Sequence, residues 1–151
     1  MSAISNPFLN AEINAPNEFQ EFFQRYSQST GASSVDELDR KPFPRMVDFW
    51  FLAIGVAVKK KLKAVDLTGM ATYKAAEGAA VSSPEWRIHA LKLIAIGETG
   101  DPTIVTDGRA MMRIANSLAF AGMPHLVEIL EEHLDDEAFG LCDALIDLLD
   151  N

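Results

Sequence analysis

Cysteine is almost absent from this chain of 151 residues, because Cys142 is the single one. One thiol cannot close an internal disulfide, which agrees with a reducing cytoplasm. The N-terminus has neither a charged region nor an apolar region of the kind found in export signals. The longest nearly unbroken apolar run, residues 46–58, is too short to cross a membrane as a helix. These absences predict a cytoplasmic protein that makes no membrane contact.

Sequence patterns of catalysis and cofactor binding are also missing. No two glycines have the G-x-G spacing of a dinucleotide-binding loop. His125, Glu128, Glu132 and His133 fall on a compatible side of one expected helix, but they form neither H-E-x-x-H nor a paired E-x-x-H. The thiol of Cys142 falls on an apolar helix face and is predicted to be buried. We therefore expect no catalytic residue, no cofactor and no metal, with a metal-dependent helical enzyme near Glu128, Glu132 and His133 as an alternative.

Lysine and arginine are missing from the last 28 residues, which account for the whole formal net charge of −9. Asp143, Asp147 and Asp150 recur at i, i+4 and i+7 of the last expected helix, with no basic partner at helical spacing. This stripe is either a solvated face or a surface that binds a basic partner. Together with Glu131 and Asp135, these three residues are the candidates for partner binding.

Basic residues gather instead in the middle of the chain, around a single acid, Asp48. They could contact nucleic-acid phosphates and release counterions. The two ends of the helix expected over residues 45–63 lie about 30 Å apart, however, and the overall acidity opposes such binding. Asp48, in the first turn of that helix, is predicted to pair with Arg45. The nucleic-acid candidates are Arg40, Lys41, Arg45, Lys59, Lys60, Lys61 and Lys63.

Apolar spacing predicts a succession of helices, and no alternating strand pattern of useful length is present. Residues 1–16, rich in Asn, Ser and Pro, are expected to form a flexible N-terminal arm. Residues 17–151 are expected to form a single helical domain whose C-terminal helices, residues 124–151, are acidic. Trp50 and Trp86 are predicted to anchor its core. The predicted class is all-α, a compact bundle of about seven helices with no significant sheet. The helices are expected over residues 17–29, 45–63, 70–81, 82–97, 111–121, 126–134 and 137–149, with one or two further turns from residue 34.

Three segments carry a resemblance to a known class of proteins. They are RMVDFWFLAIGVAVKK at 45–60, PEWRIHALKLIAIGETG at 84–100 and RIANSLAFAGMPHLVEIL at 113–130. Their succession, about a third of the chain, resembles small helical accessory proteins encoded with bacterial DNA-modification and defence enzymes. The resemblance implies a noncatalytic subunit or regulator beside a larger protein, and it transfers no functional residue.

The sequence thus predicts a noncatalytic adaptor or regulatory subunit of a larger intracellular assembly. Its partner is expected to be another protein or a second copy of the chain. A nucleic-acid-binding accessory protein that uses the basic residues 40–63 is the alternative from another class.

Overall fold

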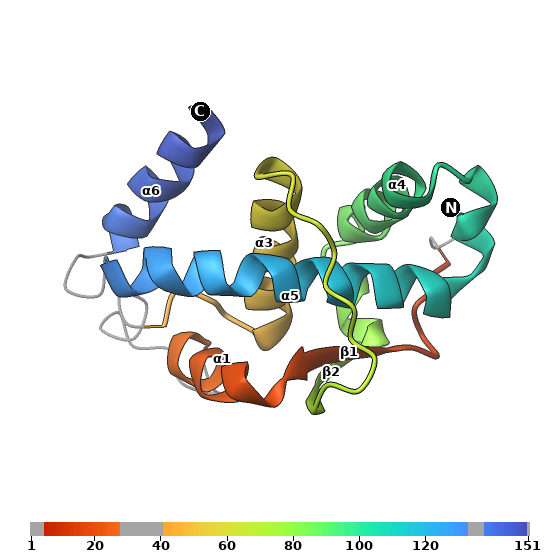
Figure 1. Ribbon diagram of the computed structural model, residues 1–151, viewed down its shortest axis with the longest axis horizontal. Helices are drawn as coiled ribbons and strands as arrows, with labels where there is room; N and C mark the ends of the chain where they lie inside the picture. Colours follow the sequence, from red (N-terminus) through yellow and green to blue (C-terminus); the bar gives the residue numbers. More distant parts are fainter. Residues whose placement is uncertain (1–4, 28–40, 133–137, 151) are drawn as a thin grey trace.

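The computed structural model describes residues 5–27, 41–132 and 138–150 (Figure 1). The chain is predominantly helical, but the predicted all-α bundle of about seven helices without a sheet is wrong. The described residues form five α-helices and two paired strands, joined in part by short 3₁₀ helices. The helices are α1 Gln20–Tyr26, α3 Met46–Lys59, α4 Trp86–Thr99, α5 Gly108–Glu132 and α6 Ala138–Asp150, and the strands are β1 Glu12–Pro16 and β2 Thr72–Glu77.

Helix α5 is the axis of the molecule. In Figure 1 it runs across the centre, with α4 and α6 on one side and α1 and the two strands on the other, while α3 crosses it steeply. Buried side chains on both helices, among them Trp50 and Leu118, fill the α3–α5 contact. No helix in the described ranges is long and apolar enough to cross a membrane.

The predicted break after residue 121 is absent, because α5 continues through Gly122 and Pro124 to Glu132. Gly122 lies where α5 meets α3, and a Cβ there would overlap the carbonyl oxygen of Ala53. Gly122 therefore allows the two helices to cross closely. The sequence around it is equally typical of a glycine that ends a helix.

The sheet corrects two further expectations. Residues 72–77, within the helix predicted over 70–81, form β2, which pairs antiparallel with β1. Residues 5–16, most of the predicted flexible arm, are packed instead, and Phe8, Ile13 and Ala15 have no exposed surface. The alternation of Ile13 and Ala15 is too short to predict a strand alone, and the partner strand lies about 60 residues further along the chain.

An aromatic cluster joins α1 to α3 and β2. The Phe23 ring centroid lies 4.6 Å from that of Phe49 and 6.2 Å from that of Tyr73. Burial raises the pKa of the Tyr73 hydroxyl to about 12. That hydroxyl has no hydrogen-bond partner among the residues described.

Predictions for single core residues have mixed outcomes. Trp50 is fully buried, as expected, but Trp86 is 57% exposed and Cys142 is exposed. Helical spacing predicts that a residue lies on an apolar face, but it does not predict which faces another element will cover. The turns expected near residue 34 lie outside the described residues.

Candidate functional site

The predicted acidic stripe is exposed on α6, where Asp143, Asp147 and Asp150 all face solvent. Glu131 belongs to α5, and its carboxylate lies 3.9 Å from the Arg25 guanidinium, with both side chains about half exposed. Such an exposed pair contributes little to stability. Asp135 lies outside the described residues. The structure therefore places four of the five acidic candidates on two helices near one end of the molecule (Figure 1).

The predicted basic cluster is divided by the length of α3. Arg45 precedes the helix, whereas Lys59 ends it and the other lysines follow, all of them exposed. The 14 residues of α3 separate the two groups by about 20 Å. Lys41 is half-buried, and Arg40 lies outside the described residues. Only Lys59, Lys60, Lys61 and Lys63 remain together as a basic group.

Arg45 is engaged in holding α3 to α4. The predicted pair with Asp48 is confirmed, with an Arg45 Nη2 to Asp48 Oδ1 distance of 3.4 Å, and Arg45 also donates to the carbonyl oxygen of Ser83. A second guanidinium that the sequence analysis did not predict, that of Arg87, lies 2.7 Å from the same carboxylate. The Asp48 and Arg87 side chains are only 14% and 13% exposed, so solvent screens this pair weakly.

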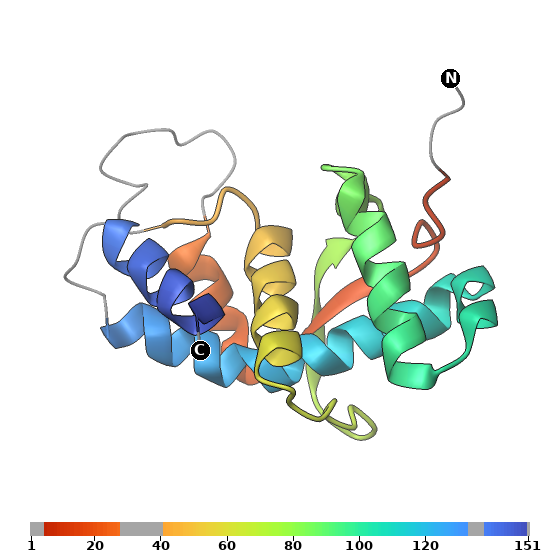
Figure 2. The ribbon, with the colours of Figure 1, turned by 90° about the horizontal axis from the view of Figure 1, so that it is seen from above.

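Next to the Asp48–Arg87 ion pair, α3 and α4 carry apolar side chains that are exposed to solvent. The Trp86 ring meets Phe51 edge-on at 5.4 Å, and the Arg87 guanidinium lies 4.8 Å from the Phe51 centroid. Trp86 is the first residue of α4, and Phe51 lies in the first half of α3, and Figure 2 shows the two helices from above. Leu93, two turns after Trp86, is 70% exposed, and Val58, two turns after Phe51, is 45% exposed. We call Phe51, Val58, Trp86 and Leu93 the α3–α4 apolar surface.

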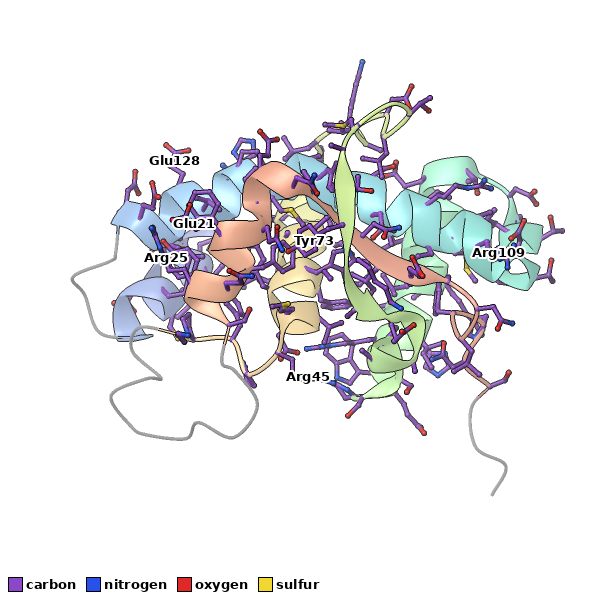
Figure 3. The ribbon with its side chains drawn as sticks, turned by 90° about the horizontal axis from the view of Figure 1, so that it is seen from below. Glu21, Arg25, Arg45, Tyr73, Arg109 and Glu128 are labelled. Carbon is purple, nitrogen blue, oxygen red and sulfur yellow. The ribbon has the colours of Figure 1, made fainter. Side chains whose placement is uncertain are left out.

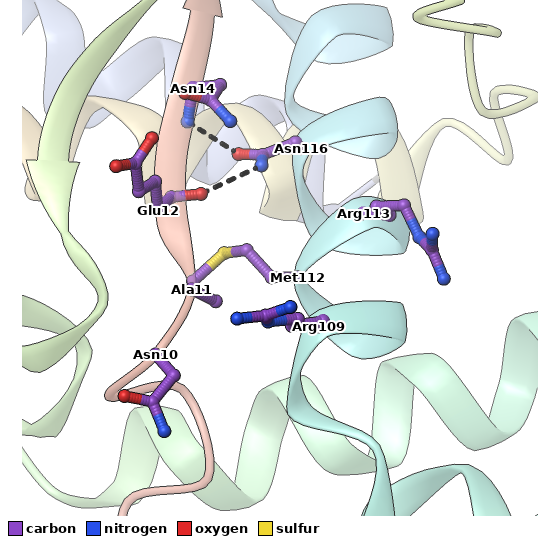
Figure 4. Close-up of a pocket in the computed structure, with 8 residues that line it drawn as sticks. All are labelled: Asn10, Ala11, Glu12, Asn14, Arg109, Met112, Arg113 and Asn116. Atoms are coloured by element: carbon purple, nitrogen blue, oxygen red, sulfur yellow. Dashed lines mark hydrogen bonds between the residues drawn. The ribbon is translucent and has the colours of Figure 1, made fainter.

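A hollow of about 270 Å³ lies between β1 and the first half of α5 (Figure 4). Arg109 extends from α5 toward the strand, with the Met112 thioether beside it, whereas Arg113 extends away from the strand. The other lining residues are Asn10, Ala11, Glu12, Asn14 and Asn116. We call this region the β1–α5 hollow.

Asn116 fixes the two walls of the hollow to each other. Its Oδ1 accepts from the backbone N–H of Asn14 at 3.1 Å, and its Nδ2 donates to the carbonyl oxygen of Glu12 at 3.2 Å. The same oxygen accepts from the indole nitrogen of Trp50 at 3.0 Å. This buried side chain thus ties β1, α5 and α3 together.

The predicted metal alternative gains no geometric support. Within the described ranges no group of three or more His, Cys, Asp or Glu side chains could hold a metal ion. His125 is half-buried on α5, Glu128 and Glu132 are exposed, and His133 lies outside the described residues.

Sequence reasoning missed the β1–α5 hollow and the exposure of Trp86 and Leu93. One signal for the hollow was available. Arg109 stands in the first turn of a helix, where the macrodipole favours acidic side chains, so helix stability does not explain an arginine there. No comparable signal identifies Asn10, in the loop before β1, or Asn14, on β1, because both segments pack against residues far along the chain.

No protein-family model, curated protein or solved structure matches this chain.

Proposed function

We propose that the protein is a noncatalytic interaction protein, an accessory subunit that binds a protein partner through the α3–α4 apolar surface. The observation that carries the proposal is the exposure of Trp86 and Leu93 on one face of α4, at 57% and 70%. Tryptophan is among the residues that most often dominate the binding energy at protein interfaces, and the buried centre of such interfaces is rich in apolar side chains.

The surface is held ready for binding. The Asp48–Arg87 pair fixes the start of α4 against α3, and the Phe51 ring packs edge-on against the Trp86 ring. A side chain that is already oriented loses less conformational entropy when a partner covers it. The exposed lysines after α3 adjoin Val58 and would form a charged rim, which steers association.

The proposed setting is a larger assembly in the bacterial cytoplasm. The resemblance of the segments at 45–60, 84–100 and 113–130 to accessory proteins of DNA-modification and defence systems supports this choice. The acidic residues of α6 would then be a second contact or a solvated face.

The test is recovery of the tagged protein from its native cells after nuclease treatment, with the recovered complex sized and identified. We expect one stoichiometric partner that is lost when Leu93 is changed to Glu. The matched control is Leu9→Glu, because Leu9 is a similarly exposed leucine, at 61%, outside the surface. Retention of the partner by Leu93→Glu, or its equal loss from both variants, would contradict the proposal.

A nucleic-acid-binding accessory is the second candidate. The observation that favours it is the exposure of Lys59, Lys60, Lys61 and Lys63 in one run at the end of α3. Binding through these lysines would weaken steeply as salt concentration rises. Replacement of all four by alanine should then abolish binding to a DNA or RNA duplex in a mobility-shift assay, and unchanged binding would exclude this candidate.

A further inference from the structure

We propose that the β1–α5 hollow binds a carboxylate side chain from an acidic peptide segment of a partner protein, with Arg109 as the residue that recognises it. The inference rests on the proposed function in one respect, that the ligand belongs to a protein. It concerns a different surface, which lies on the opposite side of α5 from α4.

The guanidinium of Arg109 has unused binding capacity. Neither Arg109 nor Arg113 has a hydrogen-bond or ion-pair partner within the part of the chain that the structure describes. Glu12 is the single acid that lines the hollow, and its carboxylate lies 3.7 Å from Lys74 on the neighbouring strand. No acidic side chain in the described ranges therefore neutralises Arg109. A guanidinium presents its N–H groups in a planar fork that matches a carboxylate.

The other lining groups suit the same ligand. The Asn10 and Asn14 carboxamides can donate to a carboxylate oxygen or to a peptide carbonyl. Ala11 and Met112, which are both buried, give the hollow an apolar wall for the methylene groups of a glutamate. The hollow thus offers the Arg109 cation, two amides and a small apolar wall to an acidic side chain, and its own acid, Glu12, is paired with Lys74.

The walls are rigid, which favours recognition. Asn116 joins β1 to α5 at one end of the hollow. At the other end Gly108 lies against Pro7, where a Cβ would overlap the Pro7 carbonyl oxygen. The Gly78 N–H donates to the carbonyl oxygen of Ala11 at 3.0 Å from the β2 side. The loop that carries Asn10 is thus held on three sides, so binding would order few further groups.

The size and position of the hollow favour a peptide over a whole small molecule. At about 270 Å³ and open to solvent, it is smaller than the enclosed pockets that bury most of a ligand. One or two side chains fill such a space while the rest of the peptide lies on the surface. Arg109 also lies far from the acidic residues at the other end of the molecule, as the positions of Arg109 and Glu128 in Figure 3 show. Repulsion of an acidic ligand by those residues would be screened by salt over that separation.

The test uses the full chain with a short fluorescein-labelled peptide rich in glutamate, and the same peptide with glutamine in place of each glutamate. Fluorescence anisotropy should show tighter binding of the glutamate peptide. Arg109→Gln should weaken it about tenfold, since a hydrogen bond to a charged group is lost. Arg109→Lys should recover only part of the affinity, because it keeps the charge and loses the fork. Arg25→Gln is the control, because Arg25 is an exposed arginine on α1 that does not line the hollow, and it should change the affinity much less.

Location is checked by amide chemical-shift changes on peptide addition, which should be confined to residues 10–14 and 109–116. Equal affinity for the two peptides, an equal effect of the two arginine variants, or shift changes elsewhere would overturn the assignment. Self-association that Arg109→Gln abolishes, without peptide binding, would also overturn it in favour of a second copy as the source of the acid.

The variant Leu93→Glu separates this inference from the proposed function. It should bind the glutamate peptide as the unaltered chain does, because α4 does not line the hollow. If Leu93→Glu loses the native partner but the glutamate peptide does not bind the unaltered chain, the inference about the hollow is wrong and the proposed function stands. If the glutamate peptide binds but Leu93→Glu keeps the native partner, the proposed role of the α3–α4 apolar surface is wrong and the inference about the hollow stands.

Discussion

The Asn116 side-chain oxygen accepts a hydrogen bond from the Trp50 indole nitrogen at 3.0 Å, in the buried contact between α5 and α3. The same amide group bonds to the N–H of Asn14 and the carbonyl oxygen of Glu12, which flank Ile13 on β1. A neighbouring strand would make this pair of bonds in a parallel ladder. One asparagine side chain on a helix thus bonds to one N–H and one carbonyl oxygen of β1, as a neighbouring strand would.

Asn116→Ala is expected to lower the free energy of unfolding by about 2–3 kcal/mol, because it leaves buried donors and an acceptor without partners. Urea denaturation followed by tryptophan fluorescence measures the change. Asn17→Ala is the control, since the Asn17 side chain is exposed, and it should change stability by less than about 0.5 kcal/mol. Equal effects of the two variants would contradict the role given to Asn116.

Gly122→Ala should destabilise the fold by about 2–3 kcal/mol, because the added methyl group forces α5 away from the Ala53 carbonyl oxygen. Gly97→Ala is the matched comparison within α4, where a Cβ would meet open space. It should stabilise the protein by about 0.5–1 kcal/mol through helix propensity. Thermal unfolding of the two variants by circular dichroism tests the opposite signs.

Asp48→Ala should cost about 3 kcal/mol, because it leaves the Arg87 guanidinium with little exposure and no carboxylate partner. The double variant Asp48→Ala, Arg87→Ala should cost less than the sum of the two single changes. A double-mutant cycle in urea measures that coupling. Arg25→Ala, at an exposed pair with Glu21, should have little effect. Additive single effects at Asp48 and Arg87 would show that the two do not interact.

The raised pKa of Tyr73 predicts a loss of stability in alkali. Burial disfavours the ionised hydroxyl in the folded protein, so the pKa rises from its ordinary value of 10.0 to about 12. The contribution of Tyr73 is therefore complete below about pH 10 and lost as pH rises from 10 to 12. Tyr73→Phe should reduce this alkaline loss while changing stability little at neutral pH, where its hydroxyl has no described hydrogen-bond partner. The free energy of unfolding of the unaltered chain and of Tyr73→Phe, measured from neutral pH to pH 12, tests both expectations. Identical pH profiles for the two would contradict the expected smaller loss in alkali.

Helix α3 was largely predictable from its sequence, because a long apolar run preceded by Pro44 and followed by lysines predicts a buried helix whose end reaches solvent. The first-turn pair of Arg45 and Asp48 followed from their spacing. The sheet was not predictable, because each strand is short and its pairing depends on a segment about 60 residues away. Local propensity instead favoured a helix for the alanine-rich β2.

The candidate surfaces were harder to predict than the elements that carry them. Trp86 and Leu93 share a helix face by spacing, yet their exposure depends on which elements pack against α4. Arg109 could be noted as an arginine at the wrong end of a helix, but its hollow exists only because the loop at Asn10 folds back against Gly108. Such long-range packing leaves no periodic pattern in the sequence.

The dependence of β1 on Asn116 also orders events during synthesis. Residues 12–16 leave the ribosome about 60 residues before their ladder partners at 72–77 and about 100 residues before the side-chain amide of Asn116. The native surroundings of this strand are therefore incomplete until Asn116 has been translated, and until then Ile13 is not buried as it is in the folded protein.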